Sequence, residues 1–420
     1  MKYKYFYFHL FSKLFILLQT KFILSQVLNK IIKLADEPYR YTHFSFTSEG
    51  DMIIDTSAFP DRDGRKIYGL KKNNKYYFKD EHNKDTPYLD LKIERTTNPG
   101  RIEGESIIVK LEGDSNGKEC LIGISKEADY QGYYVEIYDL DTKTIKYELT
   151  NNIFGHIASI IFSALKFPDD IDSPNYDYIF SYITKTYYFE VMKVSFNLVN
   201  TNFYDKSSLI SIPNANINMV SCFFTEKKKY ICFYQNKNSN YVIIVFDNCF
   251  INYSKTEISC SHFDNVMFLK GIHLKKEIGA YIYYKSTSTS YPTFTLKECN
   301  SDNEMVDYNS FGEIELNKIL CNKETLFNDL IKINDNKTCF VSPNNDNKKL
   351  YIVIFNLYNN DLEMTIRYYI IETYKNNNFL FFQEVKAALF NNFICIAFSV
   401  CSRSTCGGVY SEDHYSSFFI

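Results

Sequence analysis

The eleven cysteines have the most versatile chemistry in this sequence, because a thiol can bind metal, form a disulfide or act as a nucleophile. They stand at positions 120, 222, 232, 249, 260, 299, 321, 339, 395, 401 and 406. None of them forms a Cys-x-x-Cys motif, and the seven histidines form no His-x-x-x-His motif. Because zinc sites need clustered ligands, we predict no metal-binding residue and no cofactor.

Two pairs of cysteines are candidates for disulfide bonds. A short turn at residues 226–228 would place Cys222 opposite Cys232 on neighbouring strands, with their Cβ atoms about 4.5–5.5 Å apart. Cys401 and Cys406 flank a short loop and form the second candidate pair. For each pair the alternative is two buried free thiols that pack as small apolar residues. The odd number of cysteines leaves one thiol spare or paired with another chain.

Carboxylates could bind calcium or act in acid–base catalysis. Asp51, Asp61 and Asp63 lie near Gly64 but lack the closing glutamate of an EF-hand loop, so a polar turn is the simpler interpretation. Glycoside hydrolysis needs a pair of acids, which several strand units could bring together. The acids in or beside predicted strands are Asp55, Glu136, Asp139, Glu190 and Asp247. Outer-strand acids facing water explain them more simply, so we predict no catalytic residue.

Two short motifs match the acceptor pattern for N-glycosylation. They begin at Asn252 (Asn252-Tyr253-Ser254) and at Asn336 (Asn336-Lys337-Thr338). Both lie near the ends of predicted strands, where a glycan could be accommodated. The pattern is common by chance in an Asn-rich chain, so it is weak support for secretion.

The elements that would position these residues are short β-strands. Residues 217–260 form the clearest unit, in which apolar and aromatic runs alternate with polar turns as in a four-stranded meander. Its strands are predicted at 217–225, 230–234, 241–246 and 250–258. Similar units are predicted at 42–78, 106–149, 158–212, 266–316 and 330–371, and an incomplete one at 379–400. Four-stranded units of about 40–50 residues are typical of a β-propeller.

We therefore predict an all-β fold, a β-propeller of about seven four-stranded blades over residues 41–420. The last blade is either incomplete or completed by the chain end at residues 418–420. Six or eight blades, tandem β-sandwiches and a β-helix remain alternatives. Neither a WD40 nor a kelch signature recurs, so no named propeller family is assigned. Three long connections are predicted, at residues 79–104, 166–175 and 285–290. Because propellers bind ligands through loops, we expect a ligand to bind at these connections.

The N-terminus resembles a secretory signal peptide. Lys2 and Lys4 precede an apolar run at residues 14–18, and small Ser25 follows a second apolar patch. We predict a signal peptide over residues 1–25 and a short helix or arm over residues 26–40. An amphipathic N-terminal helix and a wrongly assigned start are the alternatives. Lys13 and Lys21 interrupt the apolar runs, so no membrane span is predicted here.

Composition narrows the classes of partner. The 420 residues have a formal net charge of -3 and include 36 Tyr and 36 Phe, enough to bury a large core. Without a basic surplus, nucleic acid is not expected as a partner. We predict a secreted or cell-surface propeller that binds a protein or a glycan on a loop face without catalysis. The alternatives are an extracellular glycan hydrolase and an intracellular scaffold.

Overall fold

The structure is a computed structural model. It describes strands along the whole ring, and most of the turns it describes lie in the second half of the chain. The described residues are 39–46, 52–58, 66–70, 91–94, 102–110, 119–126, 133–139, 144–149, 163–168, 178–184, 186–197, 203–216, 219–247, 250, 252–259, 268–285, 291–310, 312–316, 328–344, 349–358, 361–370, 381–390, 393–401 and 415–419.

The first two sheets are four-stranded antiparallel meanders. Blade 1 consists of β1 (Tyr39–Phe46), β2 (Met52–Ala58), β3 (Lys66–Leu70) and β4 (Leu91–Glu94). Blade 2 consists of β5 (Ile102–Lys110), β6 (Glu119–Lys126), β7 (Tyr133–Asp139) and β8 (Thr144–Leu149).

The next two sheets repeat the same order. Blade 3 consists of β9 (Ser163–Lys166), β10 (Tyr178–Ile183), β11 (Phe189–Asn197) and β12 (Phe203–Ile212). Blade 4 consists of β13 (Ser221–Phe224), β14 (Tyr230–Gln235), β15 (Tyr241–Phe246) and β16 (Tyr253–Ile258).

Among the last three sheets, blades 5 and 7 vary this order at the outer edge, whereas blade 6 keeps it. Blade 5 consists of β17 (Leu269–Lys275), β18 (Ile278–Lys285), β19 (Tyr291–Cys299), β20 (Met305–Asp307) and β21 (Ile314–Glu315), with the 3₁₀ turn η2 (Tyr308–Ser310) between the last two. Blade 6 consists of β22 (Asp329–Asn334), β23 (Lys337–Asn344), β24 (Lys349–Tyr358) and β25 (Asp361–Ile370). Blade 7 consists of β26 (Phe381–Phe390), β27 (Phe393–Cys401) and β28 (Tyr415–Phe419).

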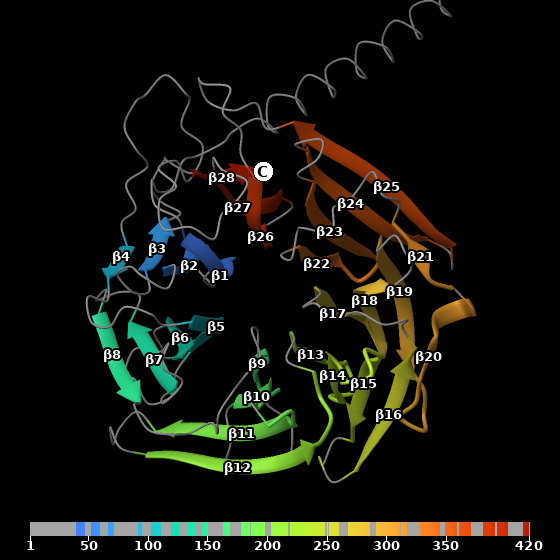
Figure 1. The fold of residues 1–420 in the computed structure, drawn as a ribbon, viewed down its shortest axis with the longest axis horizontal. Helices are drawn as coiled ribbons and strands as arrows, with labels where there is room; N and C mark the ends of the chain where they lie inside the picture. Colours follow the sequence, from blue (N-terminus) through green and yellow to red (C-terminus); the bar gives the residue numbers. More distant parts are fainter. Residues whose placement is uncertain are drawn as a thin grey trace, which may run out of the picture.

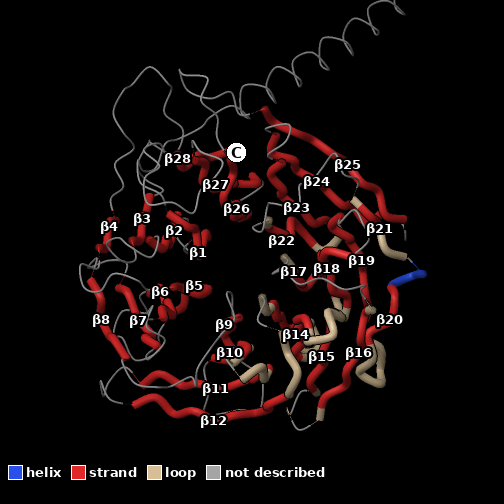
Figure 2. The backbone as a smooth tube through the Cα atoms, viewed as in Figure 1, coloured by secondary structure: helices blue, strands red, loops and turns tan. Residues whose placement is uncertain are grey.

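Seven sheets of the described chain are arranged radially around a central axis, as Figure 1 shows. The first strand of each sheet lies innermost, and neighbours contact one another in the order β1, β5, β9, β13, β17, β22 and β26. Contact between β26 and β1 closes the ring. The fold is therefore a β-propeller, and Figure 2 shows that its described backbone is strand and turn apart from η2. Tandem sandwiches and a β-helix are excluded as descriptions of it.

Both faces of the middle blades are buried, because each sheet is packed between two others. In β14, Ile231 and Phe233 pack toward blade 5, whereas Tyr230, Cys232 and Tyr234 pack toward blade 3. This explains why β14 and β15 are continuous apolar runs in sequence.

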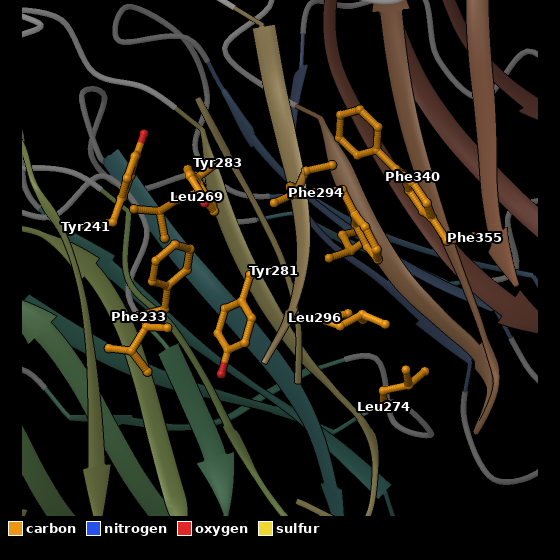
Figure 3. Close-up of a cluster of buried hydrophobic side chains, with 14 of the residues drawn as sticks. Phe233, Tyr241, Leu269, Leu274, Tyr281, Tyr283, Phe294, Leu296, Phe340 and Phe355 are labelled. Atoms are coloured by element: carbon orange, nitrogen blue, oxygen red, sulfur yellow. The ribbon is translucent and has the colours of Figure 1, made fainter. Parts of the chain in front are cut away.

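Aromatic side chains fill the spaces between blades. In the cluster that joins blades 4, 5 and 6, Phe294 stacks on Phe355 with ring centroids 3.6 Å apart (Figure 3). Phe233 meets Tyr281 edge-on in the same cluster, with centroids 5.3 Å apart. Burying each such side chain contributes on the order of 1.5–3 kcal/mol, so these clusters are the main force that holds neighbouring blades together.

Three details differ from the sequence prediction. The strand that pairs with β3 in the described part is β4, which lies inside the stretch 79–104 predicted as a long connection, and residues 71–78 at the end of the predicted 42–78 unit lie outside the described residues. The inner strand β17 lies at Leu269–Lys275, whereas the first strand of the 266–316 unit was expected at residues 266–269. Its Ile272 and Leu274 alternate with Gly271, His273 and Lys275, as in a half-buried strand. The outer strand of blade 5 is split into β20 and β21. The predicted signal peptide and the arm up to residue 38 lie outside the described residues.

Candidate functional site

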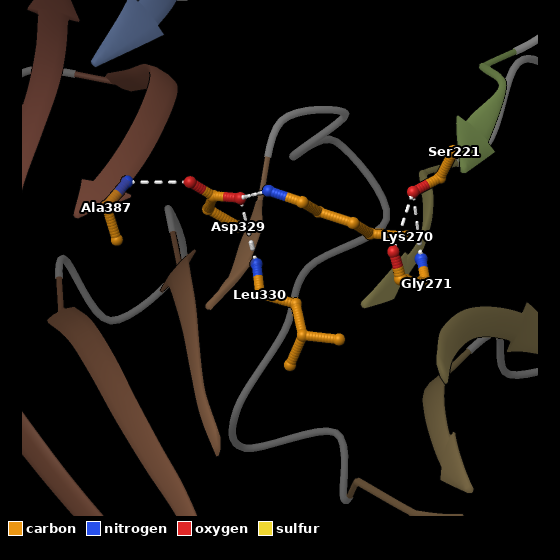
Figure 4. Close-up of polar contacts among 6 residues, drawn as sticks. All are labelled: Ser221, Lys270, Gly271, Asp329, Leu330 and Ala387. Carbon is orange, nitrogen blue, oxygen red and sulfur yellow. Dashed lines mark hydrogen bonds and ion pairs between the residues drawn. The ribbon is translucent and has the colours of Figure 1, made fainter. Parts of the chain in front are cut away.

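A buried carboxylate at the end of the ring where the inner strands begin links three blades (Figure 4). Asp329, the first residue of β22, is 2% exposed. Its Oδ1 accepts hydrogen bonds from Lys270 Nζ of β17 and, at 2.9 Å, from its neighbour's backbone nitrogen, Leu330 N. Its Oδ2 accepts from Ala387 N of β26 at 2.7 Å. Three donors thus compensate the buried charge, as burial of an ion requires.

A second polar contact extends this linkage to blade 4. Ser221 Oγ of β13 donates to the Gly271 carbonyl oxygen at 2.9 Å and accepts from Gly271 N at 3.1 Å. Both hydrogen bonds lie near the starts of inner strands, at the same end of the ring as Asp329. The inner strands of blades 4 to 7 are therefore linked by specific polar contacts, which gives these groups a structural role.

The same end of the ring carries a well-held turn surface on blades 3 and 4. The β10–β11 turn, the β14–β15 turn and the β12–β13 connection meet there, since each follows or precedes a strand end on that side. Ala215 N donates to Tyr187 O at 2.9 Å, and Lys237 N donates to Asn214 O at 2.8 Å. Asn216 N donates to Gln235 O at 2.8 Å. These hydrogen bonds join the three segments into one rigid surface.

Two adjacent tyrosines dominate this surface. Tyr187 and Tyr188 are 38% and 39% exposed, although tyrosine normally buries much of its ring. Lys237 Nζ lies 3.8 Å from the centroid of the Tyr187 ring, within cation–π range. Exposed Pro213 and Asn214 border them on the β12–β13 connection. We refer to Tyr187, Tyr188, Lys237, Pro213 and Asn214 as the tyrosine surface.

The backbone at Tyr187 does not explain why a tyrosine stands there. Its φ of 67° is left-handed, which favours Gly or Asn over a bulky side chain. The corresponding left-handed position in the β14–β15 turn is Ser239. The turn therefore does not require a tyrosine at position 187, and the exposed ring is available for contacts outside the turn.

Buried groups support the tyrosine surface from below. Phe189 and Tyr234 stack with centroids 4.4 Å apart and planes 4° from parallel. Asn236 Oδ1 accepts from the backbone nitrogens of Asn238 and Asn240, each at 3.0 Å, which fixes the β14–β15 turn. Because these turns are already ordered, binding of a ligand here would lose little conformational entropy.

The opposite end of the ring is lysine-rich and internally paired. Glu226 Oε1 accepts from Lys276 N at 2.7 Å, and buried Glu277 Oε1 accepts from Lys227 N at 3.0 Å. Lys229 Nζ reaches from blade 4 to the Asn300 carbonyl oxygen of blade 5 at 3.0 Å. These turns therefore lock neighbouring blades together.

The predicted carboxylates do not converge where the structure describes them. Glu190 accepts from Tyr182 Oη at 2.9 Å within blade 3, and Asp247 accepts from Asn252 N and Nδ2 at 3.2 Å in an outer turn of blade 4. The side chains of Asp55, Glu136 and Asp139, and residues 51, 61 and 63, lie outside the described part. Among the residues described, no group of three metal-ligating side chains comes together.

Residues 113–117 (Gly-Asp-Ser-Asn-Gly) match the Gly-x-Ser-x-Gly pattern of a nucleophile elbow. That elbow requires a strand followed by a helix. These residues instead connect two antiparallel strands, β5 and β6. The pattern is therefore no argument for acyl transfer.

The predicted Cys222–Cys232 pair lies directly opposite in the β13–β14 register. Both thiols are free in the structure, as are those of Cys299, Cys339 and Cys395, so the bridge stays a prediction. Burial, followed by the neighbouring Cys222 thiol, raises the pKa of Cys232 well above its ordinary value. Cys401 ends β27, and Cys406 lies outside the described residues.

Both predicted glycosylation acceptors are exposed. Asn252 precedes β16, and Asn336 lies in the β22–β23 turn, where its Oδ1 accepts from Lys275 Nζ at 2.7 Å. The structure does not test whether either carries a glycan. The long connections predicted as binding loops fall almost wholly outside the described residues, at 79–90, 95–101, 169–175 and 286–290.

The tyrosine surface was not predicted. Tyr187 falls inside the predicted 158–212 unit, and residues 236–240 lie between the predicted strands 230–234 and 241–246. The sequence signal that could have found this surface is a pair of aromatics directly after the turn formers Thr184-Lys185-Thr186, where a turn tip is expected to be polar.

No helix in the described residues is long and apolar enough to cross a membrane.

Comparison with known proteins supports the fold. No family model matches the sequence, and no curated protein matches it. Among solved structures, the chain is similar to the WD40 domain of Toxoplasma gondii coronin, with a TM-score of 0.50, 9% identity, and coverage of 93% of this chain and 84% of that one. The Dos1 propeller gives a TM-score of 0.47 at 10% identity over 91% and 81% of the two chains. The SapL1 lectin, solved with alpha methyl fucoside, gives 0.41 at 8% identity over 79% and 96%. At 9% identity the likeness to the coronin domain concerns the fold alone.

Proposed function

We propose that this protein is a non-catalytic propeller that binds a protein ligand on the tyrosine surface. The observation that carries the proposal is the pair of exposed tyrosines, Tyr187 and Tyr188, on turns fixed by hydrogen bonds between two blades. Tyrosine is enriched among the residues that dominate binding energy, because it buries a large rigid area and keeps a polar tip. Loops on a rigid scaffold are where such sites usually lie.

Lys237 strengthens this proposal. Its ammonium group holds the Tyr187 ring in one orientation through the cation–π contact at 3.8 Å. Less side-chain freedom is then lost on binding, which lowers the entropic cost of binding by about 0.5–1.5 kcal/mol for each side chain already immobilised.

A glycan is the second candidate ligand, and the flanking amide favours it. Exposed Asn214 stands beside Tyr187 on the adjoining connection. An aromatic face next to amide groups can stack on a sugar ring while the amide hydrogen-bonds its hydroxyl groups. The same variants test both ligands.

The experiment compares three forms of the protein. Wild type is screened against displayed protein domains and against a glycan array, and each binder is then titrated against the variants. The test variant combines Tyr187→Asn with Tyr188→Ser, because asparagine tolerates the left-handed backbone. Tyr253→Ser is the matched control, since Tyr253 is 47% exposed on an outer strand of blade 4.

Loss of two central tyrosines should weaken binding by about 2–4 kcal/mol, or roughly 30- to 1000-fold in Kd, while the control keeps wild-type affinity. Equal affinity of the test variant and the control for every binder would refute the proposal. A binder found only on the glycan array would favour the second candidate.

Secretion is part of the proposal and has its own test. Mass analysis of protein from its native source, with and without reduction, should show cleavage near Gln26 and at least one disulfide. An intact N-terminus with eleven free thiols would contradict a secreted protein.

A further inference from the structure

The outermost strand of blade 6 exposes an apolar face. On β25, Met364, Ile366 and Tyr368 are 41%, 43% and 52% exposed. The corresponding strand of blade 4, β16, instead exposes Tyr253, Lys255 and Glu257. The long β25 strand lies on the outer rim of the ring, as Figure 1 shows.

The exposed face of β25 continues the core between blades 5 and 6. Met364 pairs with Phe355 across the β24–β25 ladder, and Tyr368 pairs with Tyr351. Both β24 partners are buried in the cluster that joins these blades. The outer strand of blade 5 is split into pieces of three and two residues, so it offers little cover to this face.

The free edge of β25 is long. It spans ten residues, and among the described strands it pairs only with β24. The hairpin closes on the pair Tyr358 and Asp361 through a two-residue connection, and such a closing pair is hydrogen-bonded. Residues 361, 363, 365, 367 and 369 therefore bond to β24. Residues 362, 364, 366, 368 and 370 direct their N–H and C=O groups outward, where an edge strand can pair.

We propose that β25 pairs antiparallel with β25 of a second copy of this chain, about a two-fold axis at Thr365. In this register, Met364 of each copy forms a hydrogen-bonded pair with Ile366 of the other, and both are outward-bonding residues as the ladder requires. Leu362 then stands opposite Tyr368, which extends the apolar face across the junction.

Charge and apolar pairing together select this register. It places Glu363 of each copy opposite Arg367 of the other, which gives two cross-strand ion pairs on the face that carries Thr365. Only shifts by an even number of residues keep the outward groups aligned. A shift of the axis to Ile366 places Arg367 opposite Thr365 and loses the ion pairs. A shift to Met364 gives ion pairs between Asp361 and Arg367, but it leaves Tyr368 unpaired and breaks the continuous apolar face. The interface uses the same patch on both copies, as a two-fold dimer requires.

Charge exchange tests the register. Sedimentation across a concentration series should show wild type in a monomer–dimer equilibrium. Glu363→Arg alone and Arg367→Glu alone should each weaken dimerisation at least about tenfold, because like charges then face each other. The double variant should return to within about threefold of wild type. Lys255→Glu, on the exposed face of β16, is the control for altered surface charge.

A cysteine at the axis gives an independent readout. Thr365→Cys places two thiols at a non-hydrogen-bonded pair, where Cβ atoms lie about 4.5–5.5 Å apart, so mild oxidation should give a covalent dimer. Lys255→Cys should not crosslink under the same conditions. A wild type that stays monomeric throughout the series, or a dimer that the double charge variant does not restore, would overturn the proposal.

Discussion

Removal of the Asp329 carboxylate tests whether one buried charge holds blades 5, 6 and 7 together. Asp329→Ala leaves Ala387 N, Leu330 N and Lys270 Nζ without their acceptor. Ala387 N is the most serious loss, because it belongs to a different blade and loses a 2.7 Å hydrogen bond to a charged group. The variant should loosen the contact between the inner strands β22 and β26.

The magnitude follows from these three contacts. Each hydrogen bond to a charged acceptor contributes about 1.5–3 kcal/mol, and breaking a buried pair costs about 3–5 kcal/mol. The lysine adds less than a fully buried partner would, because its side chain is 25% exposed and can turn to water. We expect Asp329→Ala to lower the free energy of unfolding by about 3–5 kcal/mol and Lys270→Met to lower it by about 1–2 kcal/mol.

Urea denaturation followed by circular dichroism measures these changes, since the chain has no Trp to report unfolding. Asp335→Asn is the control, because it removes a carboxylate that pairs with Lys332 on an exposed turn, and it should leave the midpoint unchanged. Hydrogen exchange should accelerate in β22 and β26 before it does in β13. A loss below about 1 kcal/mol for Asp329→Ala, or equal losses for Asp329→Ala and Asp335→Asn, would refute the reasoning.

Two further predictions concern packing and thiols. Gly279→Ala would place a Cβ 2.6 Å from Phe223 Cζ and 2.8 Å from the Tyr281 hydroxyl. This overpacking should lower the free energy of unfolding by about 1–3 kcal/mol, seen as a lower urea midpoint. Gly312→Ala meets nothing within 4 Å and is its control; equal effects would contradict the packing argument. Burial raises the pKa of the Cys395 thiol to about 12, and burial and then the Asp329 charge raise that of Cys339, so iodoacetamide should label neither until urea unfolds the chain. These thiols stay protonated in the fold, whereas the unfolded chain loses their protons near the ordinary thiol pKa. The free energy of unfolding should therefore fall as pH rises from that value toward about 12. Labelling of the native protein at neutral pH would contradict the burial of these thiols.

Much of the fold could be predicted from the sequence. The strand β15 was predicted with its observed bounds, because six consecutive apolar residues bounded by polar turns admit few other structures. The count of about seven blades is confirmed by the seven sheets of the described chain. Strand β17 was placed too early because a glycine is rarely central in a strand, and the close approach of the Tyr281 ring from the next strand, which explains Gly271, is not visible in the sequence.

The candidate site could not be predicted in the same way. The tyrosine surface depends on hydrogen bonds between blades 3 and 4, such as Lys237 N to Asn214 O, which no pattern within one repeat reveals. The Asp329 contacts likewise join residues about sixty positions apart. Long-range polar contacts carry no periodic signal, whereas apolar alternation does.

The most direct test of the account is the footprint of a bound ligand, measured by hydrogen exchange on the protein with and without its binder. The account predicts slower exchange at residues 184–190, 211–216 and 236–240, which form the turns around Tyr187, Tyr188 and Lys237. Protection confined to the opposite turns, at residues 225–229, 275–278 and 334–337, would contradict it.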